Sequence, residues 1–125
     1  MSILDASALL ALLFKEPGHE SVAAAADGAL ASTINLAEVL TRFVRDGHPV
    51  AAVVRQLEIY AIKWVPFDDV HAAEVAALWP KTRRAGLSLA DRACLALALD
   101  RNLPVLTADR VWTDLGLPID IRLIR

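Results

Sequence analysis

The sequence of 125 residues contains a single cysteine, Cys94. One thiol forms neither a disulfide framework nor a zinc site built from several cysteines, so both classes are excluded. A lone cysteine fits a reducing compartment, where disulfides are rare. The amino terminus carries an acid, Asp5, where a secretory signal peptide would carry Lys or Arg. We therefore expect a cytoplasmic protein.

An excess of positive charge is also missing. The chain has 13 Lys and Arg against 15 Asp and Glu, which gives a net charge of −2, and the pI is about 5.9. A general basic coat for nucleic acid is therefore excluded, whereas a local basic patch is not. The sequence shows no fixed-period repeat and no Gly/Ser-rich or Pro-rich linker. We expect a single domain over residues 1–125.

Long hydrophobic runs are absent as well. The longest are residues 6–14, interrupted by Ser7, and residues 93–99, whereas a membrane-spanning helix needs about 20 apolar residues. We therefore expect no membrane association, although 56% of the residues are apolar and the mean hydropathy is +0.44. The surplus comes mostly from 23 alanines and 20 leucines, which are strong helix formers. Such a surplus is typical of a surface that a partner covers.

Short apolar runs alternate with helical patterns along the chain. The runs predict strands at residues 2–5, 29–32, 63–67, 104–107 and 119–124. The segments between them predict helices at 7–14, 20–27, 36–45 (N-cap Asn35), 49–61, 68–84 (bent at Pro80) and 89–101 (N-cap Ser88), with one helical turn after Asp109. This alternation is typical of a parallel sheet covered on both faces. We predict a three-layer α/β/α fold around a mostly parallel sheet of about four to five strands.

Four carboxylates stand out by their positions in this pattern. Asp5 ends one predicted strand and Asp109 follows another, whereas Glu38 and Asp91 lie near the starts of predicted helices. In an alternating α/β fold, the carboxyl ends of strands and the starts of the following helices share one edge of the sheet. We therefore expect all four side chains to converge at that edge.

Each acid also has a purely structural explanation. Asp5 and Asp109 are suitable N-caps, and Asp91 can complete a capping box at the start of its helix. Glu38 can pair with Arg42 one turn later. The weakest of these explanations concerns Asp5, because an acid at a buried strand end is costly without a partner.

A divalent cation would resolve the repulsion among clustered carboxylates, which otherwise raise one another's pKa. Mg²⁺ prefers carboxylate oxygens, whereas Zn²⁺ is disfavoured because the chain has no Cys or His cluster. His19, His48 and His71 fall in predicted loops or helix starts and are expected to be ordinary surface residues. An acid-only metal site suits hydrolysis of phosphate esters, since the ion lowers the pKa of an attacking water and stabilises the leaving oxygen.

With these acids identified, the sequence resembles the PIN-domain ribonucleases and, among them, the VapC toxins of prokaryotic toxin–antitoxin pairs. Four segments carry the resemblance, in order and over about the whole chain: residues 3–9, 31–40, 86–98 and 105–112. Each segment contains one of the four acids. The resemblance implies a metal-dependent endoribonuclease that uses Mg²⁺, with Mn²⁺ as an alternative.

The resemblance also implies a role for each site residue. Asp5 and Asp91 would hold the first metal most directly, and Glu38 and Asp109 would complete the shell, in part through water. Three polar residues, Ser7, Thr107 and Asn35, lie beside these acids, where they can orient ligands or waters; for Asn35, a role as N-cap is an equal alternative.

Basic residues near the third and fourth segments are candidate contacts for RNA phosphates, which supply most non-specific affinity. They are Lys81, Arg83, Arg84, Arg92 and Arg110. The alternative for the first three is a solvated helix end, where cations are also favoured. Arg92 can instead cover the acids or dock a partner.

The resemblance further implies an RNA substrate, a cognate antitoxin that blocks the site, and a homodimer. The apolar helices at residues 7–14 and 50–61 are candidate interface surfaces. Trp112 can stack a base, although a core position is the stronger expectation, and Asp114 is expected at the surface. The alternatives are a non-toxin PIN-type or DNA nuclease, a catalytically silent binding module and, less favoured, a receiver-like domain, which would need a Lys near the last strand.

Overall fold

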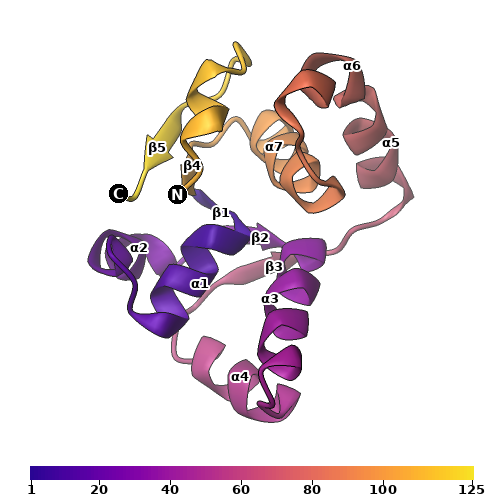
Figure 1. Ribbon diagram of the computed structural model, residues 1–125. Coiled ribbons are helices and arrows are strands. Elements are labelled where there is room, and N and C mark those ends of the chain that lie inside the picture. The colour runs from indigo at the N-terminus through magenta and orange to yellow at the C-terminus, as the bar shows by residue number, and fades with distance from the viewer.

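Five short parallel strands form the centre of the molecule in a computed structural model that describes residues 1–125 (Figure 1). They are β1 (Ile3–Leu4), β2 (Leu30–Ser32), β3 (Lys63–Val65), β4 (Val105–Thr107) and β5 (Ile121–Leu123). The order across the sheet is β3-β2-β1-β4-β5, and every neighbouring pair is parallel. The predicted α/β fold with a parallel sheet is therefore confirmed.

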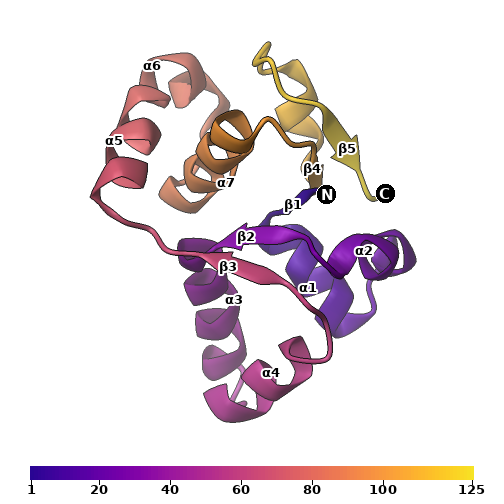
Figure 2. The ribbon, with the colours of Figure 1, turned by 180° about the vertical axis from the view of Figure 1, so that it is seen from behind.

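Helices cover both faces of this sheet. They are α1 (Ala6–Phe14), α2 (His19–Ala26), α3 (Thr33–Arg45), α4 (Val50–Leu57), α5 (Asp69–Ala77), α6 (Trp79–Thr82) and α7 (Leu89–Arg101), together with two 3₁₀ turns, η1 (Arg83–Ala85) and η2 (Arg110–Asp114). Figures 1 and 2 show α1 to α4 on one side of the sheet and α5 to α7 on the other. No helix is both long and apolar enough to cross a bilayer.

Alternate residues of the strands belong to two separate cores, because successive side chains of a strand point to opposite faces of the sheet. Leu4 and Leu106 pack with α1 to α4, whereas Ile3 and Val105 pack with α5 and α7. Trp112 is 1% exposed and belongs to the second core, as expected. The two cores contain 16 and 12 buried apolar residues, one core on each face of the thin sheet.

The start of α3 differs from the prediction. Ser32, rather than Asn35, is its N-cap, and its hydroxyl accepts a hydrogen bond from the Ile34 amide at 3.3 Å. Asn35 lies inside the helix, is 1% exposed, and donates through Nδ2 to the Ala90 carbonyl at 3.1 Å. Its role is therefore to fasten α3 to the start of α7.

The predicted helix at 68–84 is divided into α5, α6 and η1. The break falls at Leu78, just before α6, in which Pro80 occupies one of the first two positions. A proline inside a helix removes one hydrogen bond and clashes with the carbonyl four residues earlier, so it starts a new helix here. The helix predicted at 49–61 is also shorter, because Pro49 is its N-cap and α4 ends at Leu57.

The expectation for the histidines is wrong for His71. This residue is 5% exposed, and its Nε2 lies 3.0 Å from the Ala93 carbonyl of α7. Its ring also lies 5.0 Å from that of Phe67. His71 therefore joins α5 to α7 in the core, whereas His48 is exposed.

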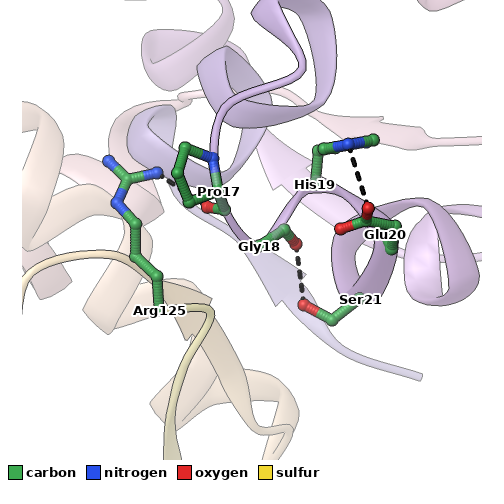
Figure 3. Close-up of polar contacts among 6 residues, drawn as sticks. All are labelled: Pro17, Gly18, His19, Glu20, Ser21 and Arg125. Carbon is green, nitrogen blue, oxygen red and sulfur yellow. Dashed lines mark hydrogen bonds and ion pairs between the residues drawn. The ribbon is translucent and has the colours of Figure 1, made fainter.

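The carboxyl terminus is fastened to the turn between α1 and α2. Arg125 donates to the Pro17 carbonyl at 3.0 Å, as Figure 3 shows, and its own carbonyl accepts from Arg110. Gly18, with φ +94°, lies directly against Ile124: a Cβ there would come 2.2 Å from the Ile124 carbonyl oxygen. Only glycine permits both this backbone conformation and this close approach.

Replacing Gly18 with alanine is expected to lower the free energy of unfolding by about 3 kcal/mol or more, because left-handed strain adds to a backbone clash. Gly28 provides the control. It has a similar φ of +83°, and a Cβ there would meet nothing within 4 Å. Gly28→Ala should therefore cost only about 1 to 2 kcal/mol. Urea unfolding of both variants tests this, and equal losses would contradict the close approach at Gly18.

Candidate active site

Asp5 lies where β1 ends and α1 begins. It is 3% exposed and is the N-cap of α1. Its Oδ1 accepts from the Ser7 hydroxyl at 2.7 Å and the Ala8 amide at 2.8 Å, and its Oδ2 accepts from the Thr107 hydroxyl at 2.5 Å. Burial raises the pKa of Asp5 from 3.8 to about 6, against the lowering effect of these hydrogen bonds.

Two hydroxyls connect the ends of neighbouring strands β1 and β4. Ser7 donates to Asp5 and accepts from the Ala108 amide at 2.9 Å. Thr107 donates to Asp5 and accepts from the Asp109 amide at 3.0 Å. Because each hydroxyl both donates and accepts, Asp5 is held rigidly relative to the backbone that leads to Asp109.

Asp91 forms the capping box that the sequence suggested. Its Oδ2 accepts from the Ser88 amide at 3.0 Å, and its own amide donates to the Ser88 hydroxyl at 3.1 Å. The charge of Asp91 nevertheless contributes to raising the pKa of both Asp5 and Glu38. Asp91 therefore caps α7 and also lies close enough to the other acids to interact with their charges.

Glu38 does not form the pair with Arg42 that would have explained it structurally. Arg42 instead pairs with Asp46, with Nε 3.3 Å from Oδ2. Although Glu38 is an exposed residue, partial burial of its carboxyl raises its pKa, and the charges of Asp91 and Asp5 add to this effect. Glu38 thus shares an electrostatic environment with two acids from distant parts of the chain.

One pocket of about 460 Å³ contains all four acids. Its lining comes from the end of β1, the first turns of α1, one face of α3, the start of α7 and the end of β4. The residues are Asp5, Ala6, Ser7, Leu10, Glu38, Thr41, Arg42, Arg45, Asp91 and Asp109. The structure therefore brings together the four acids and Ser7 in one pocket, with Thr107 bonded to Asp5.

The donor chemistry of this pocket fits a hard divalent cation. Asp5 Oδ2 accepts one hydrogen bond, and one oxygen of Asp91 and one of Asp109 accept a backbone amide. Since a carboxylate oxygen has two lone pairs, each acid keeps at least one available for a cation. No three His, Cys, Asp or Glu side chains are gathered closely enough to hold an ion, so the acids share a pocket without a ready coordination sphere.

The basic residues predicted to contact RNA lie outside this pocket. Lys81 lines a separate groove between α5 and α7, and the Arg83 guanidinium lies 5.6 Å from the ring centre of Trp79. Arg92 donates to the Val75 carbonyl at 3.3 Å. Arg110 donates to the Arg125 carbonyl. Arg84 lies on η1 and is exposed.

Three pocket residues on α3 were not predicted from the sequence: Thr41, Arg42 and Arg45. Their signal is helical spacing from Glu38, since residues three, four and seven positions later lie on the same face. The possible ion pair between Glu38 and Arg42 offered another explanation for the spacing of these two residues.

Comparison with protein families supports one assignment: residues 2–116 match the model of a family described as PIN domain. Comparison with curated protein sequences gives no match. Among solved structures, the chain is similar to a toxin–antitoxin complex from Klebsiella pneumoniae, with a TM-score of 0.80 and 18% identity over 100% of this chain and 98% of that chain.

Two further structures have the same fold. One is DNA-bound VapBC from Salmonella typhimurium, with a TM-score of 0.77 and 19% identity over 100% of both chains. The other is VapBC-5 from Mycobacterium tuberculosis, with a TM-score of 0.61 and 24% identity over 99% of this chain and 97% of that chain. At these identities the similarity shows the fold alone.

Proposed function

The chain belongs to the PIN domain family, and from this premise we propose that it is a metal-dependent endoribonuclease and the toxin of a toxin–antitoxin pair. The observation that carries the proposal is the convergence of Asp5, Glu38, Asp91 and Asp109 on one pocket. These acids come from four separate segments of the chain and face the same space. Their chemistry is that of a site for cleaving phosphodiester bonds.

Glu38 separates this proposal from a catalytically silent domain. The N-cap positions of Asp5 and Asp109 and the capping box of Asp91 account for three of the acids. Glu38 caps no helix and forms no ion pair, yet it lies in the pocket with its pKa raised. Glu38 thus makes no contact there that would stabilise the fold, whereas its carboxylate would be a ligand in a metal site.

A bound Mg²⁺ or Mn²⁺ would lower the pKa of an attacking water and stabilise charge on the leaving oxygen. Asp5 and Asp91 would hold it most directly, with Glu38 and Asp109 completing the set. Ser7 and Thr107 orient the Asp5 carboxylate through the hydrogen bonds described above. Asn35 holds the first turn of α7, and therefore Asp91, against α3.

The names of the similar structures, which are members of toxin–antitoxin systems, support an antitoxin as one proposed partner. We assign this chain a cognate antitoxin that blocks the pocket, a second copy with which it forms a homodimer, and RNA as substrate. The site of action would be the cytoplasm, where that substrate lies.

Cleavage of a structured RNA by the purified protein in Mg²⁺ or Mn²⁺, followed by EDTA, tests the enzymatic proposal. We expect cleavage that stops in EDTA and falls at least about 100-fold in Asp91→Asn. Asparagine retains an oxygen that accepts from the Ser88 amide but carries no charge. The variant therefore keeps the capping role of Asp91 and removes the charged metal ligand. Asp114→Asn, at an exposed acid outside the pocket, is the control. Cleavage that persists in EDTA would contradict the metal mechanism.

The toxin role has a separate test. Expression in a bacterial host should arrest growth, and co-expression of the neighbouring reading frame should relieve the arrest. The Asp91→Asn variant should not arrest growth although it still binds the product of that frame. Activity on DNA oligonucleotides but not RNA would instead identify a DNA nuclease.

A further inference from the structure

The pocket has a basic end that the four acids do not explain. Of its ten lining residues, two are cations, Arg42 and Arg45, and both come from α3. They follow Glu38 by four and seven positions, so they continue the same face of the helix. At 1.5 Å rise per residue, they lie about 6 and 10 Å further along α3 than Glu38.

This basic end points away from the sheet. The acids gather where β1 and β4 end, and α1 and α3 pack against each other as both helices leave that edge (Figure 1). Leu10 and Thr41 line the pocket between the two ends. The pocket is thus a groove along α1 and α3 with opposite charge at its two ends.

Arg42 is held in place, whereas Arg45 is free. The Arg42 guanidinium pairs with Asp46 at 3.3 Å and lies 5.6 Å from the ring centre of Phe14. Phe14 in turn stacks on Phe43 at 4.7 Å. Arg45 is exposed and takes part in none of the four ion pairs in the structure. A guanidinium held by its neighbours, followed one turn later by an exposed guanidinium without an ion-pair partner, suits a negatively charged chain that extends along the groove.

We propose that Arg42 and Arg45 bind the phosphates of two or three nucleotides on one side of the scissile bond. The inference rests on the proposed function, because the scissile phosphate must lie at the acids. Nucleotides in a stacked strand are about 3.4 Å apart along its axis, so the 6 to 10 Å between Glu38 and the two arginines corresponds to that number of nucleotides. Arginine forks match phosphate oxygens well.

The predicted basic residues are poorer candidates for the same role. Arg92 and Arg110 donate to backbone carbonyls, and neither Arg83 nor Arg84 lines the pocket that holds the acids. Lys81 lies in the groove between α5 and α7, which none of the four acids lines. An acidic segment of a protein partner would engage the two arginines but not the acids, whereas a polynucleotide carries phosphates for both ends of the groove.

The salt dependence of RNA binding tests the inference. For single strands, log K falls with log salt by about 0.7 for each phosphate contact. We would measure anisotropy of a labelled single-stranded oligoribonucleotide in EDTA, where binding is read without cleavage. The double variant Arg42→Gln/Arg45→Gln should bind on the order of 10-fold more weakly near 0.1 M salt and lower the slope by about 1.4.

Two further double variants serve as controls. Arg42→Lys/Arg45→Lys keeps both charges and should restore the slope, which a structural role for the guanidinium groups would not predict. Arg83→Gln/Arg84→Gln removes the same charge elsewhere and should leave the slope unchanged. In Mg²⁺, the glutamine variant should raise KM much more than it lowers kcat.

The outcomes separate the inference from the proposed function. An unchanged salt slope for RNA binding in Arg42→Gln/Arg45→Gln overturns the assignment of the two arginines to RNA phosphates. If the same variant also binds the antitoxin more weakly, the arginines belong to the protein interface instead. If the glutamine double variant lowers the slope as expected but the wild-type protein does not cleave RNA, the nuclease proposal is contradicted and the RNA-binding groove is supported. A wild-type protein that does not bind the oligonucleotide overturns both.

Discussion

Replacing Asp5 with asparagine is expected to abolish RNA cleavage and, without metal, to make the protein more stable at neutral pH. The activity should fall at least about 100-fold, because loss of a direct ligand exceeds the 10- to 100-fold cost of losing a group behind one. The gain in stability arises because Asp5 is 3% exposed and its pKa is raised to about 6. Above that pH, the folded protein must bury a carboxylate.

The size of the gain follows from the pKa shift. A change from 3.8 to about 6, at 1.36 kcal/mol per unit, corresponds to a cost of about 3 kcal/mol at pH 7. Asparagine removes the charge and keeps an oxygen for Ser7 and Ala8, while its amide can donate to Thr107. We therefore expect Asp5→Asn to raise the free energy of unfolding by about 1 to 3 kcal/mol in EDTA.

Urea unfolding in EDTA at pH 7.5, alongside cleavage in Mg²⁺, measures both effects. Asp114→Asn removes one exposed charge outside the pocket and should change neither property. A less stable Asp5→Asn protein would show that the carboxylate serves the fold, and the argument for a functional burial would then be lost.

The same opposition of stability and chemistry explains why Asp5 was the most informative residue in the sequence. A charged side chain directly after Ile3 and Leu4 breaks an apolar run at a buried strand end, and burial there is costly whatever the fold. Asp109 and Asp91 carried less information, because each occupies a position where an acid is an ordinary cap. Their convergence became predictable only through the alternation of strands and helices.

Strand limits were harder to predict than strand existence. β1 contains two residues, and the other strands contain three, so no period of two can be read from any of them. Predicted strands such as 119–124 were consequently longer than the observed Ile121–Leu123. The assignment of Ile3 and Leu4 to opposite cores depends on which helices cover each face of the sheet. The local sequence does not indicate which helices these are.

Asn35 and Arg42 show what local spacing leaves undecided. Ser32 and Asn35 are both good N-caps, and the choice depends on the Ala90 carbonyl, 55 residues away, that receives the Asn35 amide. Arg42 has an acid four residues before it and another four residues after it. It pairs with the later one, Asp46, while lying against Phe14 of a different helix. Both decisions are made by packing between helices.

Metal and pH should act on the stability of this protein in opposite directions. Asp5 has a pKa of about 6 in the folded protein and an ordinary value of 3.8. Between these values the folded state holds a proton that the unfolded chain has lost, so the free energy of unfolding falls as the pH rises. The fall should begin near pH 4, end just above pH 6, and amount to about 3 kcal/mol at most. Glu38, whose pKa is also raised, acts in the same direction.

Mg²⁺ should reverse this loss, because a metal binds the ionised carboxylates and competes with their protons. An ion present at 100 times its Kd adds about 2.7 kcal/mol to the folded state. We therefore expect Mg²⁺ to raise Tm markedly at pH 7.5 and hardly at all at pH 4.5, whereas in EDTA Tm falls between these pH values. Asp5→Asn should remove most of both effects, since it neither titrates nor binds the ion as a carboxylate. An equal rise in Tm at both pH values, or in Asp5→Asn, would place the ion elsewhere on the protein and leave the buried charge of Asp5 without a counterion.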